Sequence, residues 1–177
     1  WNDVAWPAPA RQLWPLLEWY YEQVPDGIVN DRWVPWHPLL GTSRFALVRR
    51  AIDALSRRQA KRGGGLVPPR PPHFGYRTPE YVTFQDVPPH PWECVRGMDK
   101  SFGYNACSRP EDFIAHDELL WLLTDIVAKG GNLLLNVGPR GIAAGIPDEQ
   151  LTRLDWLAQW VVPNRDALIG TRPWIHP

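Results

Sequence analysis

This sequence contains few cysteine and methionine residues, and it has no net charge. Its 177 residues include two cysteines and one methionine, and 19 basic residues balance 19 acidic ones. Two cysteines are too few for a disulfide framework, and Cys94 and Cys107 lack the CxxC spacing of a metal site, so we expect two reduced thiols. A net charge of zero gives no reason to expect nucleic acid as a partner.

Long hydrophobic runs are missing as well. No run approaches the roughly 20 residues that span a bilayer, and no charged segment precedes an apolar leader, so we expect no membrane partner. The chain begins at Trp1 without a methionine, so we expect that this is not a translation start. The localisation therefore stays open. Tryptophan and proline are abundant, with 11 and 20 residues. Prolines stiffen loops, and the flat apolar faces of tryptophan side chains suit a sugar-binding cleft.

The spacing of apolar residues predicts alternating helices and strands. A helix is expected over 13–24, with Pro15 in its first turn and Pro25-Asp26-Gly27 as its end. A helix over 113–127 should stop at Gly130-Gly131, and the apolar run at 133–137 predicts a strand that is buried on both faces. Further elements are expected as strands at 28–29, 81–84, 92–95 and 167–169, and as a helix from Pro147 with Leu151, Leu154, Leu157, Trp160 and Val161 inward.

Residues 35–72 differ in character and are expected to form an insertion. An amphipathic helix with a basic face over 44–62 is followed by Gly63-Gly64-Gly65 and by a proline-rich segment. Linkers of this kind bound an insertion or a lid. The basic face could be an interaction arm for another macromolecule, but a solvated helix face is the preferred interpretation.

The order of elements favours a parallel α/β architecture. An open doubly wound sheet would carry a glycine-rich phosphate loop early in the chain, and this sequence has none there. A barrel is therefore favoured, and since a complete (β/α)8 TIM barrel takes about 250 residues, the chain should hold roughly half of one. Residues 1–177 are accordingly expected to be one partial catalytic barrel domain.

In such a barrel the polar groups at the carboxyl ends of the strands would converge on one face. The candidates are Asp3, Asn30-Asp31-Arg32, Glu80, Phe102 to Asn105, and Asn136. Two carboxylates among aromatic side chains are typical of glycosidic-bond cleavage. The histidines at 37, 73 and 90 lack ligand spacing, so neither a metal nor another cofactor is expected.

Several motifs occur in an order that resembles the α-L-fucosidases of glycoside hydrolase family twenty-nine. They cover nearly the whole chain except the insertion, and they are Trp1-Asn2-Asp3, Val29-Asn30-Asp31-Arg32-Trp33, Arg77-Thr78-Pro79-Glu80-Tyr81, Ser101-Phe102-Gly103-Tyr104-Asn105, the run from Lys129 to Pro139, and Gly170-Thr171-Arg172-Pro173-Trp174. The resemblance implies the C-terminal half of a TIM barrel and a retaining hydrolase that cleaves terminal α-L-fucosides of glycans or simpler glycosides.

The resemblance also implies two catalytic carboxylates. Asp3 matches the nucleophile that forms a covalent fucosyl-enzyme, although an aspartate before Trp6-Pro7 could instead cap a helix. Glu80 matches the acid/base. Glu93 is the alternative acid/base, and its preferred interpretation is a structural carboxylate beneath the site.

Four more residues match or flank the sugar-binding part of that family. Arg32 matches a residue that contacts the sugar, but it could also pair with Asp31 or Asp3 to hold the loop. Phe102 matches an aromatic against the C5 methyl of fucose, and Trp6 and Trp33 could wall the pocket. For the three aromatic residues, plain packing is the alternative.

The chain also departs from this family. Val34 replaces a usual glycine, the insertion precedes Glu80, and the loop after Pro139 lacks the usual Asp-Gly turn. The earlier half of the barrel and a following β-sandwich are absent, so we expect a longer parent protein or a companion chain to supply the missing half. A non-catalytic carbohydrate-binding or scaffolding remnant is the alternative function, and self-association stays open.

Overall fold

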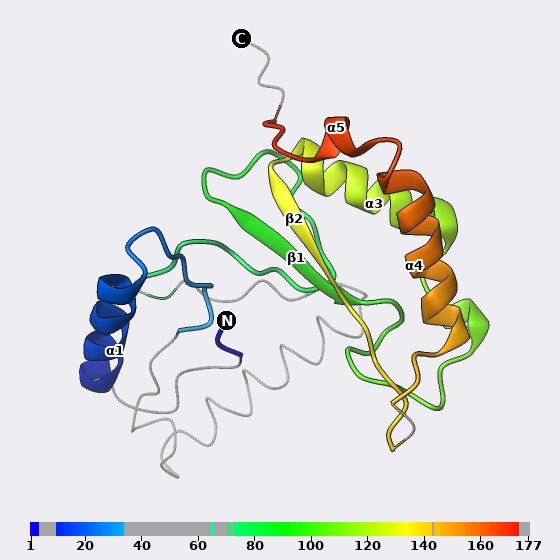
Figure 1. The fold of residues 1–177 in the computed structure, drawn as a ribbon, viewed down its shortest axis with the longest axis horizontal. Coiled ribbons are helices and arrows are strands. Elements are labelled where there is room, and N and C mark those ends of the chain that lie inside the picture. Colours follow the sequence, from blue (N-terminus) through cyan, green and yellow to red (C-terminus); the bar gives the residue numbers. More distant parts are fainter. Residues whose placement is uncertain (4–9, 34–64, 66–70, 72, 143, 174–177) are drawn as a thin grey trace. The chain divides into compact units, whose positions relative to one another are not determined.

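The computed structural model of the chain describes residues 1–3, 10–33, 65, 71, 73–142 and 144–173 (Figure 1). The chain divides into two compact units, Trp1–Val82 and Thr83–Pro177. Trp6 and the expected insertion at 35–72 lie outside the described residues, apart from Gly65 and Pro71. Within the described ranges, no helix is long and apolar enough to cross a bilayer.

The first unit begins with one amphipathic helix, α1, which spans Ala10–Gln23. Its apolar stripe buries Leu13 and Leu17 against Val29, as the spacing predicted. The expectation for Pro15 was wrong, because the helix begins at Ala10 and the proline therefore lies in the second turn. A proline there removes a backbone hydrogen bond, and burial of the two leucines, about 1.5–3 kcal/mol each, offsets that loss.

After α1 the chain turns at Pro25-Asp26 and runs past Val29 into the Asn-Asp-Arg motif. The amide of Gly27 closes the turn by donating to the carbonyl of Val24 at 2.9 Å. The expected strand at 28–29 is reduced to a single parallel bridge between Asn30 and Tyr76. This bridge is nevertheless important, because it brings the segment near residue 30 beside the segment that leads to Glu80.

The second unit contains a parallel pair of strands joined through a helix. Strand β1 spans Trp92–Gly97, helix α3 spans His116–Ala128, and strand β2 spans Gly131–Asn136. The register pairs Trp92 with Gly131 and Gly97 with Asn136. The order β1, α3, β2 confirms the expected parallel α/β arrangement in this part of the chain.

The core of the second unit lies between the strand pair and α3. Trp92 and Cys94 of β1 pack against Ile126 of α3, and all three are at most 2% exposed. The indole of Trp92 donates to the carbonyl of Lys129 at 3.0 Å, which ties the end of α3 to the start of β1. No disulfide joins Cys94 to Cys107.

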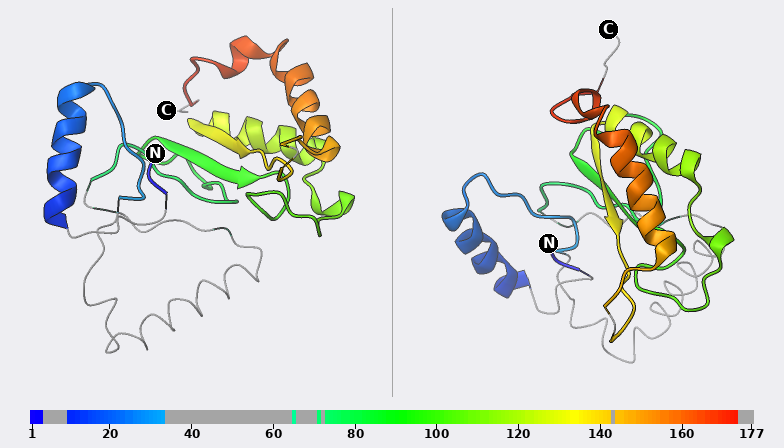
Figure 2. Two further views of the ribbon diagram at one scale, coloured as in Figure 1. Left: turned by 60° about the horizontal axis from the view of Figure 1, so that its bottom comes forward. Right: turned by 45° about the vertical axis from the view of Figure 1, so that its right-hand side comes forward.

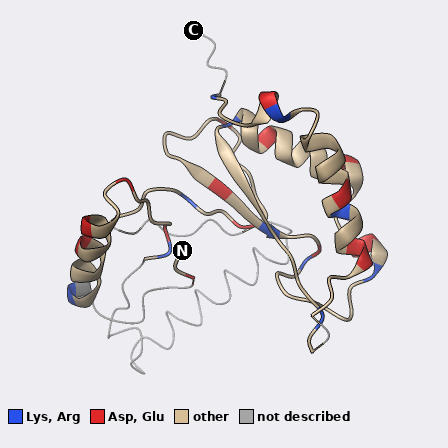
Figure 3. Cartoon of the chain, in the orientation of Figure 1, with Lys and Arg blue, Asp and Glu red and all other residues tan. Residues whose placement is uncertain are grey.

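Helix α4 spans Asp148–Val161 and contacts α3, which contacts β2. The two helices lie on the same side of the strand pair (Figures 1 and 2). The first turn of each helix contains two acidic residues, and Figure 3 draws all acidic residues in red; they complement the positive end of the helix dipole. A 3-10 turn at Pro110–Asp112 precedes α3, and a short helix, α5, at Arg165–Leu168 follows α4.

Four expectations about these elements were wrong. Residues 81–84 form no strand, because Tyr81 has a φ of 56°, outside the extended region. Residues 165–168 form α5 in place of a strand at 167–169. Strand β2 is not buried on both faces, since Leu134 is 40% exposed. In α4 the buried residues are Gln150 and Arg153, whereas Leu151 is 42% exposed.

Candidate functional site

Three sequence motifs of the first unit meet through hydrogen bonds. The amide of Asn2 donates to Asn30 Oδ1 at 3.2 Å, and Asn30 Nδ2 donates back to the carbonyl of Asn2 at 2.7 Å. The side chain of Asn2 also donates to the carbonyl of Arg32 at 3.1 Å. These bonds place the segment that ends in Asp3 directly beside the Asn-Asp-Arg motif.

A fully buried carboxylate joins that motif to the segment before Glu80. Asp31 is 0% exposed, and its Oδ1 accepts hydrogen bonds from the amide of Thr78, at 3.1 Å, and from the Thr78 hydroxyl. Its Oδ2 forms an ion pair with Arg77 Nε at 2.8 Å, and its Oδ1 lies 4.0 Å from Arg32 Nε. Two buried guanidinium groups thus share one buried counter-charge.

Arg32 extends this network to the candidate acid/base. Its Nε donates to the Thr78 hydroxyl at 2.8 Å, and its Nη2 donates to the Thr78 carbonyl at 3.0 Å. The same Nη2 lies 2.6 Å from Glu80 Oε1, an ion pair in which the two side chains are 9% and 22% exposed. Arg32 therefore holds the loop and also contacts Glu80.

The backbone at Glu80 is constrained on two sides. Gly65, the last glycine of the Gly63-Gly64-Gly65 run, lies so close to the carbonyl of Glu80 that a Cβ at position 65 would collide with it. On the other side, Tyr81 has the left-handed φ of 56°, which turns the chain sharply just after Glu80. Position 65 therefore tolerates only glycine without a shift of the Glu80 backbone.

The other predicted site residues of the first unit differ in exposure and in what the structure says about their roles. Asp3 is exposed at the end of the segment that pairs with Asn30. Trp33 is half-buried and packs against the cluster of Leu13, Leu17 and Val29, which favours the packing interpretation for this residue. Trp6 lies outside the described residues, so its role stays a prediction.

Phe102 belongs to the second unit, where it follows the carboxyl end of β1. It is half-buried in the loop between β1 and α3, and its carbonyl accepts a hydrogen bond from Asn136 Nδ2. Asn136 is the last residue of β2. The carboxyl ends of the two parallel strands are thus linked through the backbone of the predicted sugar-contacting residue.

Glu93 lies at the other end of β1. It is the second residue of the strand and pairs with Asn132 near the start of β2. Gly97 lies four residue steps further along the strand, about 13 Å at 3.3 Å per step. Partial burial raises the pKa of the Glu93 carboxyl above its usual value of 4.5. Groups at the amino ends of barrel strands typically serve stability.

The raised pKa of Glu93 leads to a prediction for stability. Between pH 4.5 and the higher folded pKa, the folded chain binds more protons than the unfolded chain, so stability falls as the pH rises. We expect Glu93→Gln to have a higher melting temperature than the wild type at pH 7 and to match it at pH 4. Thermal unfolding of the two proteins across this range tests it, with the exposed Asp155→Asn as control. A wild-type advantage at pH 7 would contradict the assignment.

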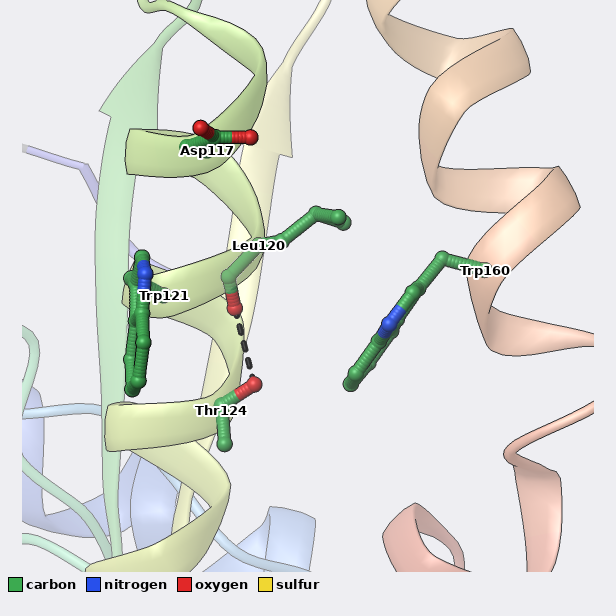
Figure 4. A pocket seen from close by; sticks show the side chains of 5 residues that line it. All are labelled: Asp117, Leu120, Trp121, Thr124 and Trp160. Atoms are coloured by element: carbon green, nitrogen blue, oxygen red, sulfur yellow. Dashed lines mark hydrogen bonds between the residues drawn. The ribbon is translucent and has the colours of Figure 1, made fainter.

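The second unit also has a hollow of about 350 Å³ between α3 and α4. Figure 4 shows its lining, with Trp121 and Leu120 from α3, Trp160 from α4, and a hydrogen bond of 2.8 Å from the Thr124 hydroxyl to the Leu120 carbonyl. None of the predicted site residues lines it.

Sequence reasoning missed the roles of several polar residues. Arg77 and Thr78 belong to the motif that contains Glu80, yet their contacts to Asp31 and Arg32 were not expected. The only available signal was their proximity to Glu80 in the sequence. Gln150 and Arg153 were missed entirely, because leucines at neighbouring positions of α4 suggested a different inward face.

Comparisons with known proteins agree with this set of motifs. The model of the family described as "Alpha-L-fucosidase" matches residues 67–166, more than half of the chain. An alpha-L-fucosidase of Branchiostoma floridae is 29% identical over 182 residues, which cover 98% of this chain and 33% of that protein. The chain thus spans about one third of the length of this relative.

Solved structures give the same result. A Thermotoga maritima alpha-fucosidase in complex with a mechanism-based inhibitor has a TM-score of 0.70 and 36% identity, and the match covers 98% of this chain and 31% of that one. The same enzyme in complex with fucose has a TM-score of 0.69 and 34% identity, with 99% and 32% covered. On the family match and these likenesses, the chain belongs to the alpha-L-fucosidase family.

Proposed function

We propose that this chain supplies both catalytic carboxylates of a retaining α-L-fucosidase, with Asp3 as nucleophile and Glu80 as acid/base. The observation that carries the proposal is the network of the first unit, in which the segments of Asp3, Arg32 and Glu80 meet around buried Asp31. The complexes of the Thermotoga relative with fucose and with a mechanism-based inhibitor support the substrate class and the mechanism.

In the first step Asp3 attacks the anomeric carbon and the bond to the leaving oxygen breaks. Glu80 gives that oxygen a proton, and a covalent fucosyl-enzyme forms. In the second step Glu80 takes a proton from water, the water oxygen attacks the same carbon, and Asp3 is released. Two inversions give net retention. A retaining mechanism requires the two carboxyl groups to be about 5–5.5 Å apart.

Arg32 has a specific part in this cycle. It is paired with the Glu80 carboxylate, whereas proton donation requires the protonated acid. We therefore expect the guanidinium to exchange Glu80 for a sugar hydroxyl or the Asp3 carboxylate when substrate binds, a role that suits its fork of donors. Thr78 holds Nε and the same Nη2 that contacts Glu80, so we expect the guanidinium to stay in place while its partner changes.

A TIM barrel is the proposed frame for this site. The parallel unit β1, α3, β2 is a building block of such a barrel, and the chain covers only about a third of its relatives. We propose that the remaining strands come from an N-terminal half-barrel, in the same polypeptide or in a companion chain. Glu93 is not favoured as acid/base, because it lies at the amino end of β1.

The test is hydrolysis of an aryl α-L-fucoside by the chain alone and by the chain completed with an N-terminal half-barrel, here called the completed enzyme. We expect turnover from the completed enzyme only, and proton NMR should show α-L-fucose as the first product. β-L-Fucose as the first product would exclude a retaining mechanism. A folded completed enzyme that binds fucose without turnover would favour the carbohydrate-binding alternative.

The identity of the acid/base can be tested by changing the leaving group. We expect Glu80→Ala to slow hydrolysis of a fucosyl disaccharide by about 10²–10⁴-fold. Its effect on a dinitrophenyl fucoside should be far smaller, because that leaving group departs without a proton. Glu93→Ala is the matched variant, and it should not change the ratio of the two rates. The reverse pattern would assign the acid/base to Glu93.

A further inference from the structure

The loop that carries Phe102 is closed at its base by a buried aspartate. Asp99 is 4% exposed, and its Oδ1 accepts a hydrogen bond from the amide of Ser101 at 2.9 Å. Its Oδ2 accepts from the Ser108 hydroxyl at 2.5 Å. The base of the loop is therefore fixed, and the position of Phe102 depends on what supports the loop between these two serines.

Two groups at the end of β2 give that support. Asn136 Nδ2 donates to the Phe102 carbonyl. Two residues later, the backbone of Gly138 approaches the Gly103–Tyr104 peptide of the loop closely. A Cβ at position 138 would be 2.5 Å from the Tyr104 nitrogen and 2.7 Å from the carbonyl carbon of Gly103. Any shift of Gly138 would therefore be passed directly to the loop.

Gly138 is held in turn by one buried side chain of α4. Gln150 is 5% exposed and lies in the first turn of the helix. Its Oε1 accepts a hydrogen bond from the Gly138 amide at 2.9 Å, and its Nε2 donates toward the Gly138 carbonyl at 3.4 Å. A single amide thus satisfies both polar backbone groups of Gly138, and both would be left buried without a partner if it were removed.

We propose that Gln150 is a positioning residue for Phe102, acting through Gly138 and the Gly103–Tyr104 peptide. The functional part of this inference rests on the proposed function and on the expectation from the sequence that Phe102 lies against the C5 methyl of fucose. The side-chain amide of Gln150 is bonded to the Gly138 backbone, so we assign it a positioning role and not a catalytic one. It fixes the distance between α4 and the loop, and so it sets how well the enzyme distinguishes a sugar with the methyl group from one without it.

The first part of the test needs no activity. In the 177-residue chain, we expect Gln150→Leu to raise the amide exchange rates of Gly138 and of the loop residues Cys107 and Ser108, whose amides donate to Asn105. The expected increase is at least about tenfold, because the leucine can neither accept nor donate. Gln150→Glu keeps an acceptor for the Gly138 amide and should give a smaller increase. Gln159→Leu is the control, since it makes the same change at an exposed position of α4.

The second part uses the completed enzyme and two aryl glycosides, the α-L-fucoside and its counterpart without the C5 methyl. We expect Gln150→Leu to lower the ratio of their kcat/KM values about tenfold, with partial recovery in Gln150→Glu and no change in Gln159→Leu. If Gln150→Leu does not fold, the intermediate values expected for Gln150→Glu decide both parts.

Each part of the test has its own result that would contradict the proposal. Unchanged exchange in the loop overturns the positioning role. Faster exchange with an unchanged kcat/KM ratio overturns the link to methyl recognition. If the wild-type completed enzyme turns over neither glycoside, the proposed function fails, and the exchange rates still decide whether Gln150 positions the loop.

Discussion

Replacement of Asp3 by glycine should reduce fucoside hydrolysis by the completed enzyme by on the order of 10³-fold or more, because the proposed mechanism forms its covalent intermediate on this carboxylate. Asp3 is exposed, so its removal should have little effect on folding. The Asn2 and Asn30 hydrogen bonds that hold this segment do not involve the aspartate side chain. Thermal unfolding of the variant and of the wild type separates a loss of chemistry from a loss of folded protein.

Azide provides the positive control for this variant. A small anion can enter the space that the carboxylate leaves and attack the anomeric carbon of an activated fucoside, which should restore turnover and give β-L-fucosyl azide. Asp26→Gly, an exposed change in the turn after α1, should retain full activity and show no response to azide. Unchanged turnover of Asp3→Gly would exclude Asp3 as nucleophile.

Asp31→Asn should strongly destabilise the first unit. It removes the buried negative charge that lies 2.8 Å from Arg77 and 4.0 Å from Arg32, while both arginines stay at least 90% buried. Breaking a buried ion pair by removing one partner costs about 3–5 kcal/mol. Amide hydrogen exchange at residues 29–32 and 76–80, read as a function of urea, measures this loss locally.

The matched control for that change is Asp26→Asn, which alters the same side chain at an exposed position. We expect its effect to stay within about 0.5 kcal/mol. Asp31→Asn should also lower activity, because Asp31 holds Thr78, which in turn holds the arginine that contacts Glu80. An Asp31→Asn protein as stable as the control would show that the two arginines find other partners.

Local patterns of the sequence predicted the regular elements well. Helix α1, helix α3 and strand β1 follow from apolar spacing and from glycine and proline signals, which act over a few residues. The failures come from interactions between distant residues. The residues around Tyr81 give no sequence signal for its positive φ. Residues 167–169 are apolar enough for a strand, but they form part of the short α5 and its C-terminal end.

The inward face of α4 shows most clearly what periodicity cannot reveal. Leu151 was expected inside, yet Gln150 and Arg153 are buried. Arg153 donates to the carbonyl of Ile114 at 2.7 Å, 39 positions away, and its guanidinium lies 5.0 Å from the ring centroid of Phe113 and 5.1 Å from that of Trp156. Polar burial of this kind depends on partners that are remote in sequence.

For the candidate site, motif resemblance pointed to the residues and the structure shows how some are connected. Arg32 and Glu80 were separate predictions, and they form an ion pair. Thr78 was not assigned a role, and it contacts both Asp31 and Arg32. Hydrogen-bond partners of this type cannot be read from spacing, because 46 or 47 positions separate them.

The strand pair of the second unit also affects how the isolated chain should behave in solution. Among the described residues β2 pairs with β1 alone, and its outward-facing Leu134 is 40% exposed. A strand with a bare edge and an apolar face is a template for self-association and precipitation. A half-barrel that covers this edge should therefore raise the soluble yield of the chain, even in the inactive Asp3→Gly variant, where catalysis contributes nothing.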